Sequence, residues 1–69
     1  MSETIDDLVK DGFTVMYTAN AEHMAIYKKG QVRAMVNMIN RKVVTHYATN
    51  YKNEKHEMKA YELLYGDKK

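Results

Sequence analysis

Several residue types are absent or rare in this chain of 69 residues. It contains no cysteine, which excludes disulfide bonds and thiolate metal sites and fits a cytoplasmic protein. It has no proline, and its three glycines are too scattered to form a phosphate-binding loop. No apolar stretch approaches the roughly 20 residues that span a bilayer, and the acidic start does not resemble a signal peptide. We therefore expect a single small cytoplasmic domain, residues 1–69, with no membrane partner.

Residues for catalysis are also scarce. The only serine, Ser2, is close to the terminus, and Glu54 and Glu57 have the one-turn spacing of ordinary solvated carboxylates. His23 and His46 lie two strand spacings apart in the predicted sheet, roughly 9 to 10 Å, whereas zinc requires each ligand nitrogen at about 2 Å. We expect no enzymatic activity, no cofactor, no metal site and no small-molecule substrate.

The strongest positive pattern is an alternation of apolar and polar residues from Phe13 to Ala48. It is interrupted at Asn20-Ala21, at Lys28-Lys29-Gly30 and at Asn40-Arg41. Alternation with a period of two indicates strands, and short polar interruptions indicate tight turns. The pattern therefore predicts a four-stranded antiparallel meander.

Helical patterns flank the strands. Residues 3–11 are expected to form a short helix, with Thr4 and Asp7 spaced as a capping box and Gly12 as its stop. Residues 51–65 are expected to form a second helix that Thr49 or Asn50 caps and Gly66 ends, followed by a frayed tail at 67–69. The fold class is α+β in the order α-β-β-β-β-α, with both helices packed on one face of the sheet.

The turn lengths determine which strand residues share a face. Two-residue turns at Asn20-Ala21 and Asn40-Arg41, with a three-residue turn between them, define one consistent apolar face. A slip of one residue at the middle turn would instead bring Ala25 and Tyr27 to that face. The predicted apolar face consists of Phe13, Val15, Tyr17, Met24, Ile26, Val32, Ala34, Val36, Met38, Val43, Thr45 and Tyr47.

The opposite face is expected to be open and to serve as an interface. It has few full charges and several apolar residues, which is typical of a surface that contacts another protein. The leading hypothesis is a non-enzymatic module that binds a protein partner, or a second copy of itself, through this face. Its candidate interface residues are Met16, His23, Tyr27, Arg33, Met35, Val44 and His46.

Basic residues support an alternative hypothesis of nucleic-acid binding. A meander brings the second turn and the start of the last helix to the same end of the sheet, where cations gather and can neutralise phosphates. Cations at turns also keep sheet edges soluble, which explains them without any ligand. The candidate phosphate-binding residues are Lys28, Lys29, Arg33, Lys52 and Lys55.

Overall fold

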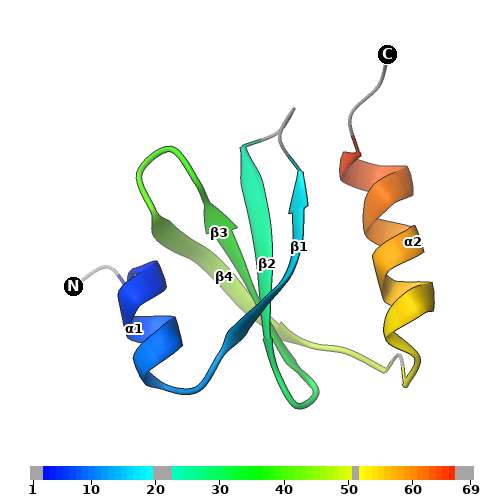
Figure 1. Cartoon of the computed structure of the whole chain (residues 1–69), viewed down its shortest axis with the longest axis horizontal. Helices are drawn as coiled ribbons and strands as arrows, with labels where there is room; N and C mark the ends of the chain where they lie inside the picture. Colours follow the sequence, from blue (N-terminus) through cyan, green and yellow to red (C-terminus); the bar gives the residue numbers. More distant parts are fainter. Residues whose placement is uncertain (1–2, 20–22, 51, 67–69) are drawn as a thin grey trace.

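The computed structural model describes residues 3–19, 23–50 and 52–66. The four strands pair in the order β1-β2-β3-β4 as one antiparallel sheet (Figure 1), which confirms the predicted α+β meander. The elements are α1 (Ile5–Lys10), β1 (Thr14–Ala19), β2 (Met24–Lys29), β3 (Val32–Asn37), β4 (Lys42–Ala48) and α2 (Glu54–Tyr65).

Both helices begin at side-chain caps. At α1 the predicted capping box is present: the Asp7 carboxylate accepts from the Thr4 backbone N–H at 2.9 Å, and the Thr4 hydroxyl accepts from the Asp7 N–H at 3.4 Å. Helix α2 starts later than predicted, because Asn53 is its cap and accepts from the Lys55 N–H at 2.9 Å. It ends at Gly66, as predicted.

The turn between β2 and β3 differs from the predicted one. Both lysines of the predicted loop belong to β2, and the chain reverses at Gly30 and Gln31. Gly30 has a φ of 60°, the left-handed conformation that favours two-residue hairpin turns. Ile26 therefore pairs with Met35 instead of Val32. The predicted register is wrong here by three positions. Because three is an odd number, the faces are exchanged as they would be by a slip of one residue, and Ala25 and Tyr27 share a face with Ala34 and Val36.

The hairpin of β1 and β2 is shifted as well. Tyr17 pairs with Ile26 instead of Met24, while the predicted loop at 20–21 lies outside the described residues. An additional residue, Met16, interrupts the β1 ladder as a bulge. Because a bulge shifts the alternation by one residue, the start of β1 presents the opposite set of side chains to each face.

The hairpin of β3 and β4 carries the second bulge. The turn spans the four residues 38–41 instead of two, which shifts the pairing by two positions, and the bulge at Val44 reverses one of them. Ala34 therefore pairs with His46 instead of Tyr47. Val44 has no opposite residue in the β3 ladder and is 62% exposed. These shifts redistribute the predicted apolar face over both sides of the sheet.

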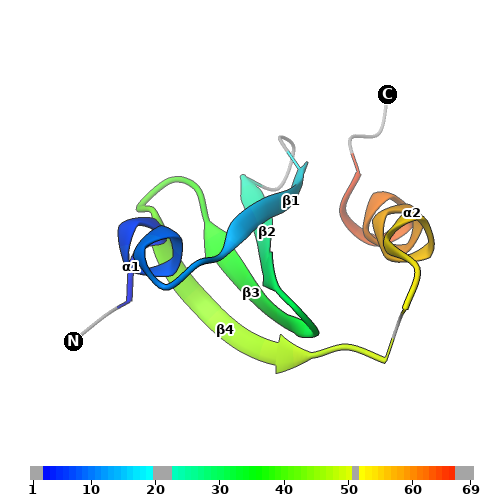
Figure 2. The same cartoon turned by 60° about the horizontal axis from the view of Figure 1, so that its bottom comes forward.

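The two helices consequently cover opposite faces of the sheet, which corrects the expectation that both lie on one face. Figures 1 and 2 show α1 on one side and α2 on the other. We call the two sides the α1 face and the α2 face. The α1 face packs Ile5 and Leu8 against Phe13, Tyr27, Ala34, Val36 and Val43. The α2 face packs Met58, Tyr61 and Tyr65 with Met16, Tyr17, Ala19, Met24, Ile26, Met35 and Tyr47.

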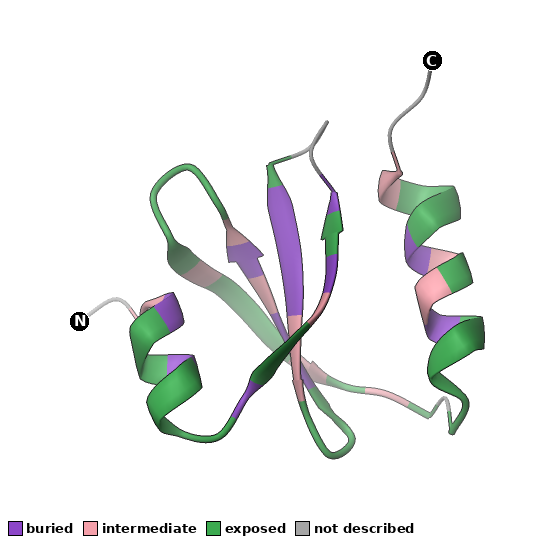
Figure 3. Ribbon diagram, viewed as in Figure 1, coloured by how far each residue is buried: buried purple, intermediate pink, exposed green. Residues whose placement is uncertain are grey.

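The edges of the sheet differ in their protection. At the β4 edge, the segment before α1 forms a bridge between Thr4 and Lys42, with hydrogen bonds from the Val43 N–H to the Glu3 carbonyl and from the Ile5 N–H to the Arg41 carbonyl. Strand β1 forms the other edge. Figure 3 shows that the buried residues of the sheet lie along β1, β2 and β3, while β4 has none and the outer side of α2 is exposed.

Candidate interaction groove

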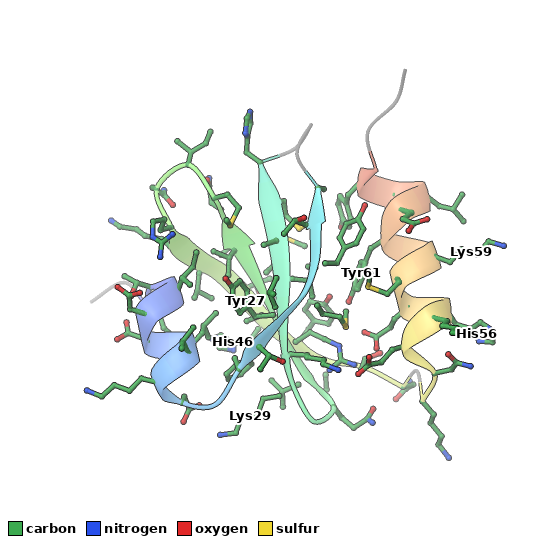
Figure 4. All side chains as sticks on the ribbon, in the orientation of Figure 1. Tyr27, Lys29, His46, His56, Lys59 and Tyr61 are labelled. Carbon is green, nitrogen blue, oxygen red and sulfur yellow. The ribbon has the colours of Figure 1, made fainter. Side chains whose placement is uncertain are left out.

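The structure separates the predicted interface residues. Tyr27 and His46 lie on the α1 face (Figure 4), while Met16 and Met35 contact the α2 cluster. The other three are His23, exposed beside a turn, Val44, exposed on the β4 bulge, and Arg33, buried beneath α2. They do not form one contiguous open face, because each face of the sheet carries a helix.

His46 belongs to the contacts that close the β4 edge. Its Nε2 lies 2.6 Å from a carboxylate oxygen of Glu3, and its ring meets the Phe13 ring edge to face at 6.1 Å between centroids. It therefore links β4 to the residues that flank α1, which is a structural contact within the chain.

A buried ion pair anchors α2 to the sheet. Arg33 donates through Nε and Nη2 to both carboxylate oxygens of Glu57, at 2.6 and 2.5 Å. Both side chains are almost completely buried, at 3% and 1% exposure. The remaining nitrogen, Nη1, donates to the carbonyls of Gly30 at 2.7 Å and Val32 at 3.1 Å. Arg33 is thus bound to its own turn and to α2, and it is not presented to a phosphate.

Two tyrosines extend this network. The Tyr61 hydroxyl donates to Glu57 at 3.3 Å and is also hydrogen-bonded to the Tyr47 hydroxyl. Figure 4 shows Tyr61 pointing from α2 toward the sheet, where its ring stacks on Tyr17. Burial raises the pKa of both Tyr47 and Tyr61 above the ordinary value of 10.0. The hydrogen bond to Glu57 raises the pKa of Arg33, so the guanidinium of Arg33 stays positively charged.

The predicted phosphate-binding cations are largely engaged with carboxylates. Lys28 forms an ion pair with Glu54, and Lys29 lies 3.5 Å from Asp11. Lys52 is exposed at the approach to α2. With Arg33 buried, the five cations do not form one continuous positive surface.

A groove between β1 and α2 brings some of the predicted residues together. Its volume is about 460 Å³. Met16 comes from the predicted interface, and Lys28 and Lys55 come from the predicted basic cluster. The complete lining is Val15, Met16, Lys28, Glu54, Lys55, Met58, Lys59 and Glu62.

The chemistry of the groove is mixed. Val15, Met16 and Met58 give it an apolar floor, and Val15 is 54% exposed. Its charged residues are three lysines and two glutamates, and Lys28 and Glu54 form an ion pair. The described residues of this lining include no serine, cysteine or histidine. An apolar floor within a nearly balanced charged rim suits a protein segment better than a polyanion.

The sequence carried a signal for the helical side of this groove. Glu54, Met58 and Glu62 recur every four residues, as do Lys55 and Lys59, so they form one flank of a helix. Nothing in that spacing indicates which strand the flank meets. The position of the flank beside β1 follows from the anchoring of α2, which the strand register determines.

Comparisons of the chain with protein-family models, with curated proteins and with solved structures find no match. Within residues 3–19, 23–50 and 52–66, no three His, Cys, Asp or Glu side chains are grouped as a metal site. Neither helix in that part of the chain has the length and apolar character needed to cross a membrane.

Removing one member of the buried ion pair should strongly destabilise the protein. We expect Glu57→Gln to lower the free energy of unfolding by about 3 to 5 kcal/mol, because it leaves the Arg33 charge buried without a counter-charge. The matched change Glu54→Gln, in the exposed pair with Lys28, should cost less than about 1 kcal/mol. Urea denaturation followed by circular dichroism measures both. Equal effects would contradict the anchoring role of Glu57.

The tyrosine pair should make stability fall at high pH. A raised pKa in the folded protein means that the neutral phenols contribute stability below pH 10, and this contribution is lost as the pH rises above 10. We expect the slope of unfolding free energy against pH in this range to be reduced in Tyr61→Phe. Urea denaturation at successive pH values compares the slopes. An unchanged slope in Tyr61→Phe would show that this hydroxyl is not held neutral by folding.

Proposed function

We propose that this chain is a non-enzymatic protein-interaction module and that the groove between β1 and α2 binds a segment of protein. The main support is the apolar floor of Val15, Met16 and Met58 beside an edge strand. Methionine side chains are flexible and polarisable, so they adapt to the shape of a bound segment. An edge strand flanked by a helix is also an arrangement in which proteins accept an extended segment.

The charges of the groove favour a protein over a nucleic acid as its ligand. Nucleic-acid binding gains its affinity from a concentrated set of free cations. Here Lys28 is paired with Glu54, and Glu62 lies in the same rim as Lys55 and Lys59. A rim of both signs suits a surface that itself carries both signs.

Two exposed valines provide a matched test of this function. Val15→Glu places a charge in the groove, and Val44→Glu places the same charge on the β4 bulge, at similar exposure of 54% and 62%. We expect proteins retained from cell extract by the immobilised wild-type chain to be retained by Val44→Glu and lost with Val15→Glu. Retention that persists after nuclease treatment and at raised salt separates protein binding from phosphate binding.

The proposal is contradicted if Val15→Glu retains the same proteins as the wild type while its circular dichroism spectrum is unchanged. Retention that disappears after nuclease treatment would favour the nucleic-acid alternative instead.

A further inference from the structure

The two edges of the sheet are unequal, and the difference indicates where another chain can approach. The β4 edge is bridged at Thr4 and Lys42, and β4 carries the ionisable residues Lys42 and His46. Strand β1 has the sequence TVMYTA, with no charged residue and no proline. Natural proteins protect exposed edges with charges, proline, bulges or a covering helix. Strand β1 has a bulge at Met16 but no charge, so its uncharged side chains, more than its backbone, are open to contact with another chain.

The flank of α2 beside β1 has a charge pattern that is complementary to itself. Helix geometry places Lys55, Met58 and Glu62 within about 60° of one another around the axis, so they share one flank. Lys55 lies toward the beginning of this flank and Glu62 toward its end, with Met58 between them. When two such helices run antiparallel, each lysine faces the glutamate of the other helix and the methionines meet at the centre.

From these two features we infer that the groove is the contact surface between two copies of this chain, related by a two-fold axis near Val15 and Met58. This inference rests on the proposed function and specifies the partner at the same site. In a two-fold contact the same patch serves both copies, so the patch must complement itself. The Lys55, Met58 and Glu62 flank meets that requirement, whereas a nucleic acid would leave Glu62 beside phosphates.

The size of the contact explains why β1 must take part. A stable protein interface covers about 800 Å² on each partner, about a sixth of the 5092 Å² surface of this chain. Helix α2 has 12 residues and presents only one flank to the groove. The edge of β1, with Val15 and Met16, supplies adjoining apolar surface in the same groove.

The bulge in β1 influences how the two copies meet. It interrupts the regular ladder at Met16, and bulges of this kind limit the pairing of one edge strand with another. It also places Val15 and Met16 together in the groove lining. The contact therefore depends on the side chains of these two residues and of Met58, flanked by the symmetric pairs of Lys55 with Glu62.

Charge exchange tests this arrangement without disturbing the core, because Lys55 and Glu62 are both exposed. The wild-type chain, of 8.1 kDa, should sediment as a dimer of twice that mass. Lys55→Glu alone or Glu62→Lys alone should raise the dissociation constant of the dimer about tenfold, since each replaces two attractive contacts by two repulsive ones. The double variant restores complementarity and should return to within about threefold of the wild type. Lys10→Glu, an equal charge change on α1, should leave the dimer unchanged.

Two results would overturn this inference. One is a wild-type chain that stays monomeric at concentrations up to about 1 mM, where even weak association is detected. The other is a dimer that both single charge variants leave intact, since that dimer uses another surface. In either case the capture experiment stays informative. If Val15→Glu no longer retains a protein that the wild-type chain retains, the groove is a site for a different partner.

Discussion

The bidentate contact between Arg33 and Glu57 is the interaction on which the rest of the α2 side depends. Glu57 and Tyr61 are the only buried residues of α2, and both belong to this hydrogen-bonded network. A buried charge that loses its partner is costly, so the pair strongly disfavours any position of α2 that separates them. The groove exists because α2 is held at that position, with its Met58 flank beside β1.

The order and type of the helices and strands follow from local patterns that can be recognised in the sequence alone. Alternation predicts the strands, and the Thr4 and Asp7 spacing predicts the start of α1. The faces of the sheet depend instead on single-residue events: a turn at Gly30 and Gln31, and bulges at Met16 and Val44. Each event moves the side chains that follow it to the other face of the sheet. A face predicted from uninterrupted alternation therefore combines residues from both sides.

The candidate site could be predicted only in part for the same reason. In the sequence Arg33 alternates with apolar residues, which is typical of a strand residue that faces solvent. In the structure Arg33 is buried, because it pairs with the carboxylate of Glu57, 24 positions later in the chain. Met16, Lys28 and Lys55 were assigned to two competing hypotheses and lie in one groove. Their association depends on the packing of α2 against β1, which no local pattern encodes.

Hydrogen exchange measured at low and high protein concentration shows directly whether the β1 and α2 side of the molecule is its contact surface. If this side is the contact surface, amides of β1 and of α2 exchange more slowly as the concentration rises, while amides of α1 and β4 exchange at the same rate. Slower exchange confined to β4 or α1 at high concentration would contradict it, because the copies would then meet at the opposite edge.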